Sequence, residues 1–193
     1  MAVDAGFDVT AVELVPESAE NIRQLAVERP RLTAIQGDFY TVPLDGRFDV
    51  VCYWDGFGVG TDDDQRRLLR RIADEWLTDD GVALIDIYTP WSAAKSAGYR
   101  QKISELAHRT YDYDASGGRW LDIWTDGQQT VRQSLRCYSP PDLALLLEGT
   151  GLSLMSVTPG GGMDWAARTW HDAVPLVQAM MFTVRLSRIN SRP

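Results

Sequence analysis

The chain has 193 residues, of which 45% are hydrophobic and 24% are charged, so it is long enough to bury a substantial core as one globular domain. Its net charge of −8 at pH 7 repels phosphate backbones, which argues against nucleic acid as a partner. No apolar run reaches the roughly 18 residues of a membrane span, and no export leader opens the sequence. We therefore expect a cytoplasmic protein with no membrane partner.

The first half of the chain alternates strand-like and helix-like segments. The expected elements are a strand at 8–14, a helix at 17–29, strands at 33–36 and 48–54, a helix from 62 to about 76, a turn at 78–81 and a strand at 82–88. The strand at 48–54 is apolar on both faces, as in a parallel strand covered by helices on both sides. This alternation is typical of an α/β fold built on a parallel sheet.

The pattern changes after Pro90. Residues 92–108 predict a helix, and the next 30 or so residues alternate polar with bulky side chains around a turn at 116–118. We therefore expect an antiparallel insert at 92–138, with strands at 109–115, 119–125 and 129–138. The rest predicts a helix that starts at Ser139, then a hairpin of strands 152–158 and 179–187 joined by a long loop with three glycines.

Residues 54–60 read WDGFGVG, with glycines at alternate positions between a strand and a helix. Such loops often hold nucleotide-type cofactors. For a dinucleotide the spacing is wrong, because the third glycine of GxGxxG would fall on Thr61. An NAD-dependent oxidoreductase is therefore the weaker alternative. If residues 54–60 were the cofactor loop, Asp86 would bind the ribose. A further helix and strand should then follow Asp86, but the sequence predicts antiparallel strands there.

Another alignment accounts for nearly the whole chain. The segments AGFDVTAVELVPESAENIRQ, AIQGDFYTVPL, FDVVCYWDGFGVG, LTDDGVALIDIY and RCYSPPDLALLLEGTGLSLMSV occur in this order. The ordered set resembles class I S-adenosylmethionine-dependent methyltransferases of the small-molecule type, from their second strand to their sixth. The chain departs from the family at Asp79-Asp80-Gly81, where Pro-Gly-Gly is usual. The resemblance implies a Rossmann-like α/β fold, mostly parallel with a terminal antiparallel hairpin. It also implies S-adenosylmethionine as cofactor and a small-molecule acceptor, methylated by in-line displacement.

The resemblance places cofactor contacts at the ends of three strands. Glu13 would hold both ribose hydroxyls, because a carboxylate accepts two hydrogen bonds at once. Asp38 would contact the adenine, and the aromatic faces of Tyr53 and Trp54 suit a cationic donor. The expected contacts are Glu13, Leu14, Gly37, Asp38, Phe39, Tyr53 and Trp54. The alternatives are an exposed acid at residue 13, an ordinary turn at residue 38 and core packing for the aromatic residues.

The acceptor is expected at the carboxyl ends of the strands, where open α/β sheets bind ligands. Asp55 and Phe57 follow the strand at 48–54, and Tyr88 and Trp91 follow the strand at 82–88. No residue stands out as a general base. No metal site is expected either, since His108 and His171 are isolated from other metal-type ligands.

The aromatic residues of the insert allow two interpretations. Tyr111, Tyr113, Trp120 and Trp124 could belong to a lid over the acceptor pocket or to an antiparallel extension that forms a homodimer. The two cysteines, Cys52 and Cys137, are too few for a disulfide scaffold and fit a reducing compartment. Cys52 lies in an apolar run, so we expect a buried thiol.

Family members begin with a strand, a GxGxG loop and a helix ahead of the residues that match here. Because Met1 stands five residues before Gly6, we expect an N-terminally incomplete methyltransferase domain at 1–193, with the first strand missing between the second and the fourth. Two interpretations follow. The chain is a fragment of an active enzyme, or it is a short inactive form that serves as an interaction protein on a decayed methyltransferase fold.

Overall fold

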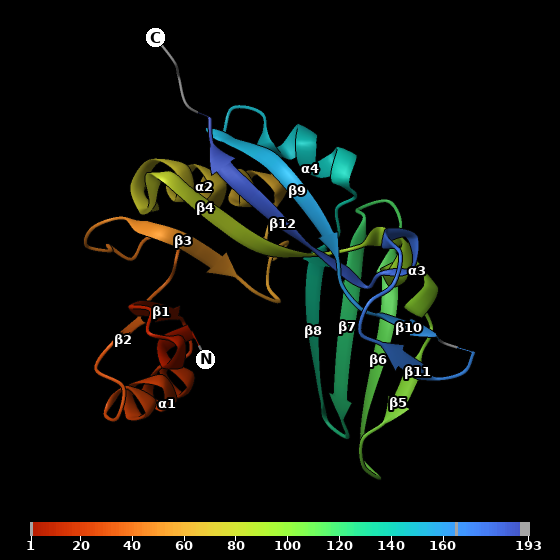
Figure 1. Ribbon diagram of the computed structural model, residues 1–193. Helices are drawn as coiled ribbons and strands as arrows, with labels where there is room; N and C mark the ends of the chain where they lie inside the picture. Colours follow the sequence, from red (N-terminus) through yellow and green to blue (C-terminus); the bar gives the residue numbers. More distant parts are fainter. Residues whose placement is uncertain (1, 165, 190–193) are drawn as a thin grey trace. The chain divides into compact units, whose positions relative to one another are not determined.

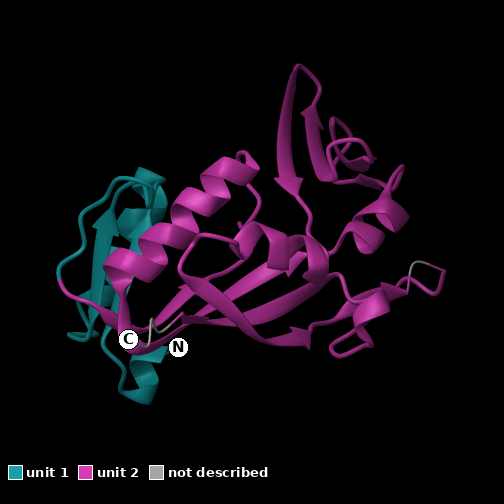
Figure 2. Cartoon of the chain, turned by 90° about the horizontal axis from the view of Figure 1, so that it is seen from above, with its two compact units in different colours: residues 1–45 teal, residues 46–193 magenta. Residues whose placement is uncertain are grey.

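The computed structural model describes residues 2–164 and 166–189 and divides the chain into two compact units, Met1–Asp45 and Gly46–Pro193 (Figure 2). Each unit is built around its own sheet structure. No helix in the described part of the chain is long and apolar enough to cross a membrane.

The first unit is a β-α-β element preceded by the 3-10 helix η1 (Ala2–Ala5). Strands β1 (Val9–Glu13) and β2 (Leu32–Gln36) pair in parallel and are connected by helix α1 (Pro16–Ala26). The helix ends earlier than the expected residue 29. Pro30 explains this, because its ring has no N–H to donate to the carbonyl of Ala26 and clashes with that carbonyl.

The second unit contains a four-stranded sheet in the order β3-β4-β12-β9 (Figure 1). Its strands are β3 (Phe48–Tyr53), β4 (Leu77–Tyr88), β12 (Met181–Arg188) and β9 (Leu152–Pro159). Strands β3 and β4 are parallel, while β12 runs antiparallel to both β4 and β9. The expected terminal hairpin is confirmed, but the sheet is mixed because one arm of that hairpin inserts beside β4.

One face of this sheet forms the core. Ala83, Ile85 and Ile87 of β4 pair with Leu186, Val184 and Phe182 of β12, and all six side chains are fully buried. The described helices of this layer are α2 (Asp62–Arg71), its π-helical continuation η2 (Ile72–Trp76) and α4 (Pro140–Leu147). The expected turn at 78–81 lies within β4, where the pairing with β3 shifts from Phe48–Leu77 to Val50–Val82.

The insert is a second, fully antiparallel sheet of the same unit. It follows helix α3 (Pro90–Ser96), and its strands are β5 (Arg100–Lys102), β6 (Ala107–Asp114), β7 (Arg119–Asp126) and β8 (Gln129–Arg136) (Figure 1). The expected helix at 92–108 is wrong beyond Ser96. Gly98 ends it with φ of +81°, a conformation that suits glycine, and the Gly98 N–H then donates to Tyr111 of β6 at 2.8 Å.

The long loop between β9 and β12 carries a small hairpin of its own. Strands β10 (Gly162–Asp164) and β11 (Thr169–His171) pair antiparallel, and the 3-10 turn η3 (Leu176–Gln178) follows them. Residues of η3 lie beside helix α3. The glycine-rich loop therefore folds back toward the start of the insert.

The expected burial of Cys52 is wrong, because this residue is exposed, whereas Cys137 is fully buried. Among the described residues β3 pairs only with β4, so Cys52 lies on an edge strand of the second unit. Desolvation, and then the charge of Asp86, raise the pKa of Cys52. Desolvation raises the pKa of Cys137 to about 11.

We expect iodoacetamide to alkylate Cys52 well before Cys137 at pH 8. A thiol with a pKa of about 11 is only on the order of one part in a thousand thiolate at this pH, and the Cys137 sulfur is also shielded by packing. Mass spectrometry of timed samples measures both rates, and urea should abolish the difference. The variant Cys52→Ser should leave only the slow reaction. Equal rates in the native chain would contradict the burial of Cys137.

Candidate functional site

Three of the expected cofactor contacts meet at one edge of the first unit. Because β1 and β2 are parallel, their carboxyl ends lie side by side, and the Gly37 N–H donates to the Glu13 carbonyl at 3.0 Å. Glu13 Oε1 accepts the Val15 N–H at 2.8 Å, and Asp38 Oδ1 accepts the Tyr40 N–H at 2.8 Å. These local bonds orient both carboxylates. Their other oxygens have no hydrogen bond to a described residue and are available to a ligand.

The neighbouring residues of this unit are less enclosed. The side chain of Leu14 is 62% exposed at the turn between β1 and α1. The ring of Phe39 is half-buried and lies 4.5 Å from that of Tyr40, centroid to centroid. Tyr53 and Trp54, the other two expected cofactor contacts, belong to the second unit.

In the second unit, the loop at residues 54–60 approaches the insert rather than forming an open glycine cradle. Gly58 has φ of +108°, and a Cβ at this position would overlap the backbone oxygen of Arg136 in β8. The Gly58 carbonyl accepts the Arg136 N–H at 2.8 Å, and Val59 forms a bridge to Leu135. The buried side chain of Gln65 in α2 accepts the Gly58 N–H at 3.1 Å. The close backbone approach that requires glycine is thus an approach to β8.

The side chains around this loop differ in exposure. Tyr53 donates its hydroxyl to the Gly56 carbonyl at 3.0 Å, and Trp54 is 51% exposed. Phe57 is fully buried, with its ring centroid 6.2 Å from that of Tyr53 and 5.7 Å from that of Tyr138. The structure therefore places Phe57 in the core and not on a cavity wall.

Two of the expected acceptor contacts are brought together. Asp55 adopts φ of +57° in the loop after β3, and its carboxylate accepts a hydrogen bond from the hydroxyl of Tyr88 at the end of β4. Desolvation, and then the bond to Asp55, hold the pKa of Tyr88 far above its usual value, so the phenol stays protonated and donates. Its ring lies 4.9 Å from that of Trp120, which in turn lies 4.9 Å from that of Tyr111.

These rings line a cavity of about 330 Å³, here called the aromatic cavity. Its aromatic walls are Tyr88, Tyr99, Tyr111, Trp120 and Trp170. The indole N–H of Trp120 is buried and meets no acceptor among the described residues. Trp91 is in the first turn of α3, and its indole N–H is likewise buried without a partner in the described part of the chain. Trp91 lines neither this cavity nor the polar cavity described below.

A salt bridge supports the wall of the aromatic cavity. Arg109 of β6 donates from Nε to the Asp122 carboxylate of β7 at 2.8 Å, and a second guanidinium nitrogen contacts the other carboxylate oxygen. The guanidinium also lies over the rings of Tyr111 and Trp124, at 4.9 and 4.8 Å from their centroids. Asp122 is only 4% exposed, so Arg109 is the group that neutralises a buried carboxylate.

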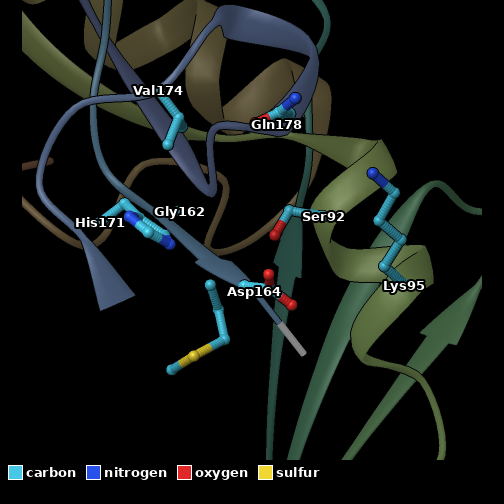
Figure 3. Close-up of a pocket in the computed structure, with 8 residues that line it drawn as sticks. Ser92, Lys95, Gly162, Asp164, His171, Val174 and Gln178 are labelled. Carbon is cyan, nitrogen blue, oxygen red and sulfur yellow. The ribbon is translucent and has the colours of Figure 1, made fainter. Parts of the chain in front are cut away.

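A second cavity of about 520 Å³, here called the polar cavity, lies between α3 and the β10–β11 hairpin with the segment that follows it (Figure 3). Its polar side chains are Ser92, Lys95, Asp164, His171 and Gln178. Ser92 and Met163 line both cavities, so the two cavities adjoin. The sequence did not single out Ser92, Lys95, Asp164 or Trp170. The sequence feature that could have pointed to these residues is the spacing of Ser92, Lys95 and Ser96, which places all three on one face of a helix.

Comparison with known proteins agrees with this architecture. No protein-family model and no curated protein matches the chain. Among solved structures, the methyltransferase CcbJ from Streptomyces caelestis is 17% identical, with a TM-score of 0.73 over 97% of this chain and 77% of that chain. An S-adenosylmethionine-dependent methyltransferase from Clostridium acetobutylicum ATCC 824 is 14% identical, with a TM-score of 0.68 over 93% of this chain and 74% of that chain.

The glycopeptide N-methyltransferase MtfA, solved with S-adenosylmethionine, is 20% identical and has a TM-score of 0.61, over 98% of this chain and 75% of that chain. At these identities the likeness concerns the fold. The chain has the α/β fold of class I methyltransferases, which confirms the resemblance found in the sequence.

Proposed function

We propose that the chain binds S-adenosylmethionine and transfers its methyl group to a small molecule. The observation that carries this proposal is the methyltransferase fold together with the adjacent carboxylates at the ends of β1 and β2. Two structural neighbours support the ligand classes. MtfA was solved with S-adenosylmethionine, and a methyltransferase from Burkholderia thailandensis was solved with 1,6-didemethyltoxoflavin and S-adenosylhomocysteine, at 17% identity and a TM-score of 0.56.

The first unit would hold the nucleoside part of the cofactor. Glu13 accepts hydrogen bonds from the two ribose hydroxyls through the oxygen that its local turn leaves available. Asp38 accepts from the adenine amino group, with Phe39 against the base and the backbone at Leu14 and Gly37 beside it. In the second unit taken by itself, the aromatic faces of Tyr53 and Trp54 suit a cationic group such as a sulfonium.

The acceptor would enter the aromatic cavity. When bound, S-adenosylmethionine supplies a methyl group that is already activated, so the chain itself has to align the acceptor and exclude water. Tyr88, held by Asp55, offers a hydroxyl group on a wall that also carries four other aromatic rings. The insert acts as the lid, since Tyr99, Tyr111 and Trp120 come from it.

We expect S-adenosylhomocysteine to bind the chain and Glu13→Ala to weaken that binding by about tenfold or more, because charge-assisted hydrogen bonds to both ribose hydroxyls are lost. Isothermal titration calorimetry measures the dissociation constants. Glu17→Ala is the matched control, since Glu17 is an exposed acid in the first turn of α1.

Each outcome has one meaning. Failure of the folded chain to bind S-adenosylhomocysteine would contradict the proposed function. Equal weakening by Glu13→Ala and Glu17→Ala, or none by Glu13→Ala, would contradict the assignment of the ribose contact to Glu13.

A further inference from the structure

We propose that the aromatic and polar cavities form one elongated binding space, in which Lys95 recognises a negatively charged group on the acceptor. The acceptor class is then a flat aromatic or ring compound that carries a carboxylate or a similar anion. The identity of this ligand as the methyl acceptor rests on the proposed function. The preference for a negatively charged ligand does not depend on the proposed function.

The first support is the junction between the two cavities. Ser92 lines both, yet only 7% of its surface is exposed. Its N–H donates to Thr89 Oγ1 at 3.3 Å, but its hydroxyl makes no hydrogen bond to any described residue. Figure 3 shows this hydroxyl projecting from α3 into the polar cavity. Because the hydroxyl faces the cavity and has no described protein partner, a polar group of a ligand at this point can bond to it.

The second support is the charge of the polar cavity. Lys95 stands three residues after Ser92 in α3, and it lies across the polar cavity from His171 in Figure 3. No ion pair to Lys95 is present in the described part of the chain, whereas Lys102, the chain's other lysine, pairs with Glu105. Lys95 is an exposed side chain on the wall of the polar cavity, and its ammonium can attract an anion that enters there.

Asp164 is the acid of the same cavity, and its own loop already engages it. Its Oδ1 accepts the N–H groups of Ala166 and Ala167, both at 3.0 Å. These bonds hold Oδ1 against its own turn, and no salt bridge joins the carboxylate to Lys95 among the described residues. The ammonium of Lys95 is therefore available to an anionic group of a ligand.

The third support is the contrast between the two compartments. The aromatic cavity, lined by five aromatic rings, favours a flat apolar body, and at about 330 Å³ it holds a small ring system. The polar cavity next to it, at about 520 Å³, has room for a substituent. A ligand that fills both has an apolar ring at one end and a polar, anionic group at the other.

Two probes that differ only in charge test this inference: 3-(2-naphthyl)propanoate and its amide, 3-(2-naphthyl)propanamide. Calorimetry with the whole chain should show the carboxylate binding about three to ten times more tightly than the amide. Lys95→Gln should reduce this ratio to about one and leave the amide unchanged, while Lys95→Arg should keep most of it. Lys102→Gln is the matched control and should change neither probe.

The inference is overturned if neither probe binds, if the wild-type chain shows no preference for the carboxylate, or if the preference survives Lys95→Gln in a variant with a native near-ultraviolet circular dichroism spectrum. Parallel titration with S-adenosylhomocysteine separates this inference from the proposed function. A Lys95-dependent preference without S-adenosylhomocysteine binding would overturn only the methyltransferase function. Binding of S-adenosylhomocysteine without a charge preference would overturn only the anion site.

Discussion

Gly58→Ala is expected to lower the free energy of unfolding of the second unit by about 3 kcal/mol or more. Two costs combine at this position. An L residue is strained at φ of +108°, and its Cβ would overlap the Arg136 oxygen while lying 3.0 Å from the Arg136 nitrogen. Both are backbone atoms of β8, so the overlap is relieved only by moving the strand or the loop.

That movement would break the bonds that connect the loop to the insert. The Gly58 carbonyl accepts from Arg136 N at 2.8 Å and from an Arg119 guanidinium nitrogen at 3.2 Å. Cys137 follows Arg136 directly and is fully buried, so its alkylation rate should rise when β8 shifts. Faster labelling of Cys137 than in the wild-type chain would therefore report the detachment at a single site.

Urea denaturation followed by tryptophan fluorescence measures the stability of the second unit, because all seven tryptophans fall within residues 46–193. Gly149→Ala is the matched control. Gly149 also has a positive φ, +71°, but a Cβ there would meet no atom within 4 Å, so the change should cost only about 1 kcal/mol. If Gly58→Ala costs no more than Gly149→Ala, the overlap with β8 is not the reason for the glycine.

The loop at residues 54–60 shows which structural features a sequence pattern can predict and which it cannot. The alternating glycines of 54–60 suggested a loop that holds a cofactor, and the failed GxGxxG spacing argued against a dinucleotide, whereas the structure shows Gly58 in close contact with the backbone of β8. The partner of that backbone, Arg136, is 78 residues further along the chain. No local pattern encodes such a contact, so its discovery required the structure.

Local periodicity predicted most strands, because the alternation of side chains along a strand is a property of the segment itself. It failed where one residue decides the outcome, as at Gly98, or where strand position in the sheet decides burial, as at Cys52. The site follows the same division. The contact between Asp55 and Tyr88 follows from parallel strands that end at one edge, whereas the residues that share a cavity with Lys95 come from a loop far along the chain.

Arg109→Met is expected to destabilise the second unit by about 3 kcal/mol. The change removes the guanidinium that holds the Asp122 carboxylate, and Asp122 is 4% exposed, so water cannot replace the lost bonds. It also removes the cation that lies over the rings of Tyr111 and Trp124. We therefore expect weaker binding of both naphthyl probes in the aromatic cavity, without a change in the ratio between them, because the charge preference belongs to Lys95.

Urea denaturation of the variants in a double-mutant cycle measures the interaction energy between Arg109 and Asp122. Asp122→Asn in the Arg109→Met background should recover part of the lost stability, since an uncharged amide is cheaper to bury than an unpaired carboxylate. Arg132→Met is the matched control, because Arg132 is an exposed arginine of β8 in the same sheet and has no ion pair among the described residues. Equal losses for Arg109→Met and Arg132→Met would show that the pair adds nothing. No recovery in the double variant would show that Arg109 acts through its aromatic contacts rather than through Asp122.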